Sequence, residues 1–290
     1  MSQERLEASL DIDRLPAADV VRIIQEEDAR VAAAVAAERD KIAHAVDEIA
    51  ERLAHGGRLF YAGAGTSGRI AALDAAELPP TFGVDPSLVR VLMAGGERAF
   101  LHAVEGAEDD EDAAIAAVNE NVKAEDALVG IAASGTTPYT VAAVRRANML
   151  GALTVGITSV PLSPLAREAD IAIVPRTGAE VIMGSSRMKS GTAQKLVLNA
   201  LSTAVMVRLG HVYSNLMIDM PATNEKLRNR AVRMVELAAG VLRPTAVQAI
   251  RDADGNVKLA AVMAGKRISA GEARALLEKH GGRLREVLEA

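Results

Sequence analysis

The sequence predicts an α/β protein built on a doubly wound, mainly parallel sheet. Five short apolar runs occur between residues 59 and 175, and stretches with helical spacing separate them. Each run is mostly apolar, as expected of a strand that is buried on both faces, and strands that alternate with helices form parallel sheets. Small and hydroxylated residues follow several runs, at the edge where such sheets bind ligands. We therefore expect three layers, αβα, with a ligand site at the carboxyl ends of the strands.

A helical segment is predicted to precede the sheet. Within residues 17–54, apolar positions from Val20 to Ile49 recur at helical spacing, and the other positions are rich in alanine and acidic residues. This pattern predicts one or two long helices, which Gly56-Gly57 ends. We assign residues 1–54 to an N-terminal helical segment.

The central domain is predicted to span residues 55–222. Its expected strands are 59–65, 88–95, 127–134, 153–159 and 171–175. A long helix is expected at about 189–209, because the apolar residues there continue without a turn signal.

Residues 223–290 are predicted to form a small helical appendage. A helix at about 224–240 precedes three short helical segments, which Asp254-Gly255 and residues 266–270 separate. Ser269 and Glu272 have the spacing of a capping box, and Gly281-Gly282 is expected to end the last segment.

The composition excludes several classes of function. The chain has 290 residues, a net charge of −5 and no cysteine, which excludes disulfides, thiolate zinc sites and cysteine nucleophiles. Its histidines are scattered, and no basic stretch is interleaved with aromatic residues as in nucleic-acid-binding surfaces. The first residues lack the apolar core of a signal peptide, and no run approaches the roughly 18 apolar residues of a membrane span. We expect a cytoplasmic protein that acts on a small molecule, with no metal, nucleic acid or membrane as partner.

A glycine-rich loop follows the first predicted strand. Residues 63–68 read G-x-G-x-x-G, which is typical of dinucleotide-binding folds. Such folds have an acidic residue at the end of the second strand, whereas the run here ends in Val91–Gly95 without one. An NAD-linked enzyme is therefore disfavoured.

Hydroxyl groups suggest a phosphate site instead. Thr66 and Ser67 stand where a helix is expected to begin, and Ser134-Gly135-Thr136-Thr137 repeats the arrangement after the third strand. The first turn of a helix has free N–H groups that favour anions. Each loop alone could be a simple N-cap. Two such loops at neighbouring strand ends favour a bound phosphate.

Two pairs of carboxylates could serve as acid and base. Asp74 and Glu77 are three residues apart at the end of a helix that we expect Pro79-Pro80 to stop, and Glu105 and Glu108 are three apart in another helical turn. This spacing places each pair on one helix face. A paired acid and base can remove one proton while protonating a leaving oxygen. Spacing alone does not select the pair.

Four long blocks of sequence resemble a known family. They are GAGTSGRIAALDAAELPPTFG (63–83), AGGERAFLHAVEGAEDD (94–110), IAASGTTPYT (131–140) and TGAEVIMGSSRMKSGTAQKLVLNALSTAVM (177–206). They closely resemble the N-acetylmuramic acid 6-phosphate etherases. The resemblance implies a sugar-isomerase (SIS) domain, a homodimer, no metal or organic cofactor, and a place in the recycling of cell-wall sugars. It also implies a lyase that converts the muramic sugar phosphate and water to N-acetylglucosamine 6-phosphate and D-lactate.

The resemblance also implies roles for individual residues. The proton donor of the family falls on Glu77, and its second catalytic glutamate falls on Glu108. The phosphate and the rest of the substrate are expected near Thr66, Ser67, Ser134, Gly135, Thr136, Thr137, Glu180, Ser185, Ser186 and Arg187. The family usually has arginine where this chain has Thr136. Three consequences stay open: weaker phosphate binding, a shift of the charge partner to Arg69 or Arg187, or an altered substrate preference.

Two alternative functions share this domain. One is a sugar-phosphate sensor without catalysis, as in the glucokinase regulatory protein, which is longer and carries two such domains. The other is a sugar-phosphate isomerase, which would use the same open-chain chemistry. Glu77 and Glu108 favour an enzyme over the sensor, and release of D-lactate would distinguish the etherase from the isomerase.

Overall fold

The computed structural model describes residues 4–222 and 224–290. Its internal contacts divide the chain into two compact units. The first comprises the residues up to Ala75 together with Ser87–Thr203, and the second comprises Ala76–Pro86 and the residues from Ala204 onward.

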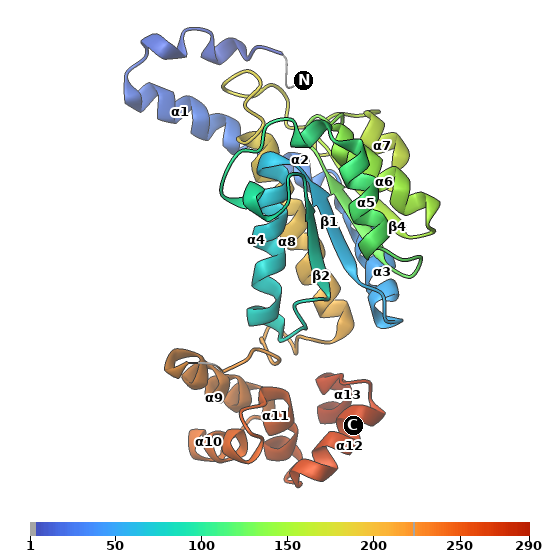
Figure 1. Cartoon of the computed structure of the whole chain (residues 1–290). Helices are drawn as coiled ribbons and strands as arrows, with labels where there is room; N and C mark the ends of the chain where they lie inside the picture. Colours follow the sequence, from blue (N-terminus) through green and yellow to red (C-terminus); the bar gives the residue numbers. More distant parts are fainter. Residues whose placement is uncertain (1–3, 223) are drawn as a thin grey trace. The chain divides into compact units, whose positions relative to one another are not determined.

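The first unit contains a five-stranded parallel sheet (Figure 1) with the order β2-β1-β3-β4-β5. The strands are β1 (Leu59–Gly63), β2 (Val89–Met93), β3 (Ala127–Ile131), β4 (Leu153–Ile157) and β5 (Ile171–Ile173). Every residue of β1, β3 and β4 is buried, as the continuous apolar runs predict. The α/β prediction is confirmed. The strands are slightly shorter than expected because the last residues of each run form the turns.

Helices cover both faces of this sheet. Phe60 and Ala62 of β1 lie in one apolar cluster with residues of α5 (Glu111–Asn121) and α6 (Pro138–Met149). Side chains alternate along a strand, so Tyr61 points to the opposite face. There its hydroxyl meets α4 (Gly65–Phe82) at Asp74, which also accepts a hydrogen bond from Ser202 of α8 (Lys189–Leu209). Two further helices complete the layers, α3 (Arg39–Ala54) against β4 and β5, and α7 (Pro164–Glu168) against the same strands.

The N-terminal segment contains more helices than predicted. Two 3₁₀ turns, Glu7–Ser9 and Ile12–Arg14, precede α1 (Ala17–Asp28), α2 (Val31–Ala36) and α3. The expectation of one or two long helices is wrong, because the chain breaks around residues 29–30 and 37–38. The end of α3 is as predicted, since Gly56 follows it with a φ of +90°.

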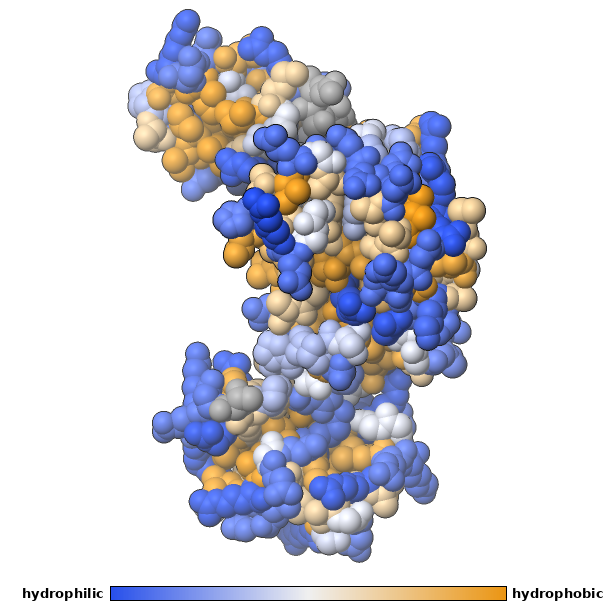
Figure 2. All heavy atoms as spheres, in the orientation of Figure 1, coloured by the Kyte–Doolittle hydropathy of each residue, from blue (hydrophilic) through white to orange (hydrophobic). Residues whose placement is uncertain are grey.

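An apolar surface lies on this segment, over α1 (Figure 2). Leu10, Leu15 and Val21 are exposed there. The segment is nevertheless anchored to the rest of its unit, since Ser9 Oγ donates to Val181 O at 2.7 Å and the buried Glu27 pairs with the buried Lys189.

Helix α4 continues through Pro79 and Pro80 to Phe82, so the prediction that the prolines stop it is wrong. Both prolines lie in the last turn, where their fixed φ is compatible with a helix and only the hydrogen bonds to the carbonyls one turn earlier are lost. The helix then ends at Gly83, whose N–H donates to Pro79 O at 2.9 Å.

Glycine allows the start of α4 to approach the sheet closely. A Cβ on Gly68 would lie 2.8 Å from Gly63 O and 2.2 Å from Met93 Sδ. The third glycine of G-x-G-x-x-G therefore serves packing of helix against strand.

The second unit has a helical core of its own. Its helices are α9 (Glu225–Ala239), α10 (Arg243–Asp252), α11 (Val257–Lys266), α12 (Ala270–Lys279) and α13 (Leu284–Glu289). Apolar residues from all five helices form one cluster. The predicted capping box of Ser269 and Glu272 is confirmed at the start of α12. The prediction of three short segments after residue 240 is wrong, because α13 adds a fourth beyond Gly281-Gly282.

Within the described part of the chain, no helix is both long enough and apolar enough to cross a membrane.

Candidate active site

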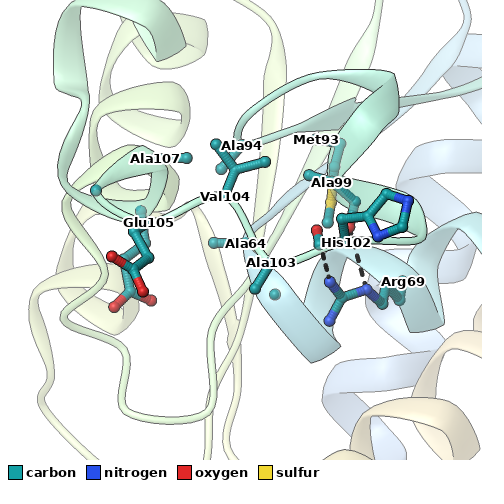
Figure 3. A pocket seen from close by; sticks show the side chains of 13 residues that line it. Ala64, Arg69, Met93, Ala94, Ala99, His102, Ala103, Val104, Glu105 and Ala107 are labelled. Carbon is teal, nitrogen blue, oxygen red and sulfur yellow. Dashed lines mark hydrogen bonds between the residues drawn. The ribbon is translucent and has the colours of Figure 1, made fainter.

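A cavity of about 240 Å³ opens at the carboxyl ends of β1 and β2 (Figure 3). Its floor is formed by Ala64 and Gly65 after β1 and by Met93 and Ala94 at the end of β2. Arg69 and the segment 99–108 complete its wall. The cavity therefore lies at the edge of the sheet where the sequence predicts a ligand.

Two carboxylates line this cavity, Glu105 and Glu108. Both are exposed and lie on the loop between β2 and α5, where Gly106 has a φ of +74° and the short turn Ala107–Asp109 follows. In Figure 3, Glu105 lies on one side of the cavity, and Arg69 and His102 lie on the other. Of the two carboxylate pairs, this is the one that lines the cavity.

Arg69 ties the start of α4 to the loop that carries these carboxylates. Its Nε donates to Ala99 O and Phe100 O at 3.1 Å, and its Nη2 donates to His102 O at 3.2 Å. Figure 3 shows the bonds to Ala99 and His102. The sequence indicates Arg69 only as a partner for a phosphate, and not as a bridge between α4 and these backbone carbonyls. Backbone carbonyls carry no sequence signature, so no pattern could have indicated it.

Glu77 lies in α4, and its side chain is exposed. It belongs to the second unit and is not among the residues that line the cavity. Its neighbour in the predicted pair, Asp74, is buried and serves the core. Asp74 accepts hydrogen bonds from Tyr61 at 2.9 Å and from Ser202 at 3.0 Å.

The environment of Asp74 shifts its protonation equilibrium. Burial raises the pKa of Asp74, although the hydrogen bonds from Tyr61 and Ser202 and the charge of Lys195 oppose that shift. Burial, with a contribution from Asp74, also raises the pKa of the Tyr61 phenol well above its usual value.

The hydroxyls of the first predicted phosphate loop lie inside the first turn of α4. Thr66 is half-buried, and Ser67 is buried and donates from Oγ to Gln194 Oε1 of α8 at 3.0 Å. Neither residue is at the N-cap position, because the helix already begins at Gly65. The alternative interpretation, that Thr66 and Ser67 are simple N-cap residues, therefore does not apply to this loop.

The second loop follows β3 and leads into α6. Thr136 donates to Ser134 Oγ from both its N–H, at 3.2 Å, and its hydroxyl, at 2.9 Å. Thr137 is the N-cap residue of α6, but its side chain makes no capping hydrogen bond within the described chain. Gly135 has a φ of +67°, and a Cβ there would lie 2.1 Å from Ser163 Oγ. Because β1 and β3 are neighbours, the two loops share one edge of the sheet.

Glu180 is buried and caps α8. Its two carboxylate oxygens accept the N–H groups of Lys189 and Ser190, each at 2.9 Å. Ser185, Ser186 and Arg187 belong to the loop that leads from Glu180 into this helix, and Arg187 is exposed. The family resemblance predicts Glu180 near the substrate, and in the structure its carboxylate caps the start of α8.

No group of three or more histidine, aspartate or glutamate side chains that could hold a metal ion occurs among the residues that the structure describes.

Comparisons with known proteins agree with this architecture. Residues 41–148 match the glucokinase regulatory protein N-terminal SIS domain, and residues 102–204 match the SIS domain family. A protein of Symbiobacterium thermophilum named N-acetylmuramic acid 6-phosphate etherase is 56% identical to this chain, covering 90% of it and 87% of the relative. Proteins of the same name from Clostridium beijerinckii, 47% identical, and Escherichia coli O9:H4, 50% identical, cover 99% and 97% of this chain and 95% of each relative.

The chain belongs to the N-acetylmuramic acid 6-phosphate etherase family. The resemblance read from the four sequence blocks is thereby confirmed. Solved structures support the fold assignment of this etherase family member. A phosphoheptose isomerase from Francisella tularensis superposes with a TM-score of 0.55, at 21% identity, over 67% of this chain and 100% of the isomerase. The phosphoheptose isomerase of Neisseria gonorrhoeae gives a TM-score of 0.53 at 18% identity, over 66% and 99% of the two chains.

Proposed function

We propose that this chain is a carbon–oxygen lyase that cleaves the lactyl ether of N-acetylmuramic acid 6-phosphate, giving N-acetylglucosamine 6-phosphate and D-lactate. The observation that carries the proposal is the 56% identity to an etherase-named relative across 90% of the chain. The cavity beside two carboxylates supports catalysis over sensing, because a sensor does not need an acid or a base there.

In the proposed reaction, the open-chain sugar has an aldehyde that acidifies the hydrogen at C2. Glu108 removes this proton, and Glu77 protonates the lactate oxygen as the C3–O bond breaks. Water then adds at C3 and a proton returns to C2, so the sum is hydrolysis. Glu108 lines the same cavity as Gly65 at the start of α4, which supports its role as the base. Such acid–base catalysis typically contributes about 10²–10⁴-fold to a rate.

The proposed phosphate site lies between the two hydroxyl loops. Thr66 and Ser67 in the first turn of α4, and Thr137 at the start of α6, are near backbone N–H groups that favour an anion. Ser134, Gly135 and Thr136 would complete it. Glu180, Ser185, Ser186 and Arg187 are proposed as further pocket residues. The exposed Arg187 could supply the positive charge that Thr136 lacks.

The family resemblance also leads us to infer a cytoplasmic homodimer without a cofactor, acting in the recycling of cell-wall sugars. The exposed apolar residues Leu10, Leu15 and Val21 support an interface on the N-terminal segment. The mass in solution, from sedimentation equilibrium, tests the dimer.

The deciding experiment is D-lactate release from N-acetylmuramic acid 6-phosphate by the purified protein and three variants. We expect turnover by the wild type and a loss of about 10²–10⁴-fold in Glu77→Gln and in Glu108→Gln, because each change removes an acid or a base. Glu105→Gln is the matched control, since Glu105 lines the same cavity and has no assigned proton transfer.

Two results would contradict the proposal. A folded wild type that binds the sugar phosphate without releasing lactate would leave the sensor or the isomerase. If Glu105→Gln were as inactive as Glu108→Gln, the loss of activity would reflect a general disturbance of the cavity and not the loss of one catalytic carboxylate.

A further inference from the structure

A buried hydrogen bond joins the first turn of α4 to α8. The Ser67 hydroxyl donates to Gln194 Oε1 at 3.0 Å, and the two residues are 8% and 2% exposed. Each hydroxyl has one proton to donate. In this arrangement the proton of Ser67 points to a protein acceptor, and only the lone pairs of its oxygen remain for other groups.

The other end of the Gln194 amide lacks a partner. Its Nε2 is buried, and no acceptor among the described residues lies within hydrogen-bond distance of it. Unsatisfied buried N–H groups are rare in native proteins, and each one calls for a physical explanation.

The backbone around this pair is closely packed. A Cβ on Gly191, one turn before Gln194, would lie 3.5 Å from Ile70 Cδ1 and 3.7 Å from Thr66 Cγ2, so α8 lies directly against the first turn of α4. Glu180 holds the start of α8 through two N–H groups. Gln194 can therefore move by rotating its terminal amide about the last side-chain torsion. The energy profile of this torsion in glutamine is broad and roughly two-fold.

We propose that Gln194 is a positioning residue that reverses its hydrogen bond with Ser67 when a phosphate binds. A half-turn of the amide places Nε2 where Oε1 now lies, so that Gln194 donates to Ser67 Oγ. Ser67 then donates its own proton to a phosphate oxygen. The amide nitrogen then has a partner, and the carbonyl oxygen loses one, which proteins tolerate better than an unpaired nitrogen donor. This inference rests on the proposed phosphate site at Ser67.

The test is a double-mutant cycle on affinity for N-acetylglucosamine 6-phosphate, measured by isothermal titration calorimetry. Gln194→Met removes the amide at similar volume, and we expect binding about two- to threefold weaker, because Ser67 then donates to the phosphate without an N–H of Gln194 to orient and polarise its hydroxyl. Gln194→Glu, an acceptor that cannot donate when ionised, should weaken binding by at least about tenfold, because an ionised acceptor holds the Ser67 proton more strongly. In a Ser67→Ala background, Gln194→Met should have no further effect.

A second readout separates positioning from a general structural role. In the D-lactate assay, Gln194→Met should raise KM and leave kcat nearly unchanged, because the lost interaction is at the phosphate and not at the reacting atoms. Ser202→Ala is the matched control. It removes a hydroxyl of α8 that also makes a buried 3.0 Å hydrogen bond, to Asp74, and we expect it to leave the affinity unchanged.

The outcomes are distinguishable. The inference would be overturned if both Gln194 variants bound the sugar phosphate as tightly as the wild type. It would also be overturned if Gln194→Met weakened binding equally with Ser67 present and with Ser67→Ala. In either case, lactate release by the wild type would still uphold the proposed function. A wild type that neither binds the sugar phosphate nor releases lactate would overturn both.

Discussion

Asp74 shows how a residue that has the pattern of a catalytic acid can serve the fold. Its spacing from Glu77 makes it a candidate for proton transfer, yet its carboxylate faces Tyr61 and Ser202 inside the core. The sequence could not reveal this, because both partners lie on other elements. Burial raises its pKa above the usual value, which means that the fold favours its protonated form.

This shift predicts a pH dependence of stability. A carboxyl group whose pKa is raised by folding contributes stability in full below its unfolded pKa, about 3.9, and loses that contribution as the pH rises through the folded value. The free energy of unfolding of the wild type should therefore fall relative to that of Asp74→Asn as the pH rises above about 4. Urea unfolding of both proteins across this range measures the difference. A difference that is constant with pH, or that grows in favour of the wild type, would show that Asp74 is ionised at little cost.

At the scale of elements, much of the fold follows from local patterns. The five strands were predictable because each run is mostly apolar, and α12 was predictable from Ser269 and Glu272. The breaks after α1 and α2 were not, since the alanine-rich sequence there has no glycine or proline to mark them. The bridge made by Arg69 escaped prediction because it joins a side chain to backbone carbonyls some thirty residues away.

The first turn of α4 offers a prediction about packing. A methyl group on Gly68 would lie 2.8 Å from Gly63 O, and this backbone atom cannot move aside as a flexible side chain can. Gly68→Ala should therefore lower the free energy of unfolding by about 1–3 kcal/mol. Gly191→Ala is the control, because its nearest neighbour would be at an ordinary 3.5 Å and alanine favours a helix. Denaturant titration compares them, and equal stabilities would refute the proposed close contact.

At the scale of the whole molecule, the chain contains two units with separate apolar clusters. A cluster confined to one unit is lost when that unit unfolds, so each unit can respond separately to heat or denaturant. The three segments predicted from the sequence, with boundaries after residues 54 and 222, stay a prediction.

Two variants test whether the units unfold separately. Ser269→Ala removes the capping box of α12 and should lower the stability of the second unit by about 1 kcal/mol, whereas Gly68→Ala acts in the first. In differential scanning calorimetry we expect each variant to shift a different part of the heat-absorption curve. A single transition that both variants move equally would instead indicate one cooperative unit.

The buried phenols of Tyr61 and Tyr139 have a spectroscopic consequence. The chain has three tyrosines and no tryptophan, so tyrosine dominates its near-ultraviolet absorption. Burial raises the pKa of Tyr61 well above 10, and burial with the charge of Asp110 raises the pKa of Tyr139 to about 12. Moderately alkaline solution therefore leaves both rings un-ionised while the fold is intact. A rise in tyrosinate absorbance by more than one ring, the share of Tyr213, would then give a label-free optical signal that the interior around the sheet has become accessible to base.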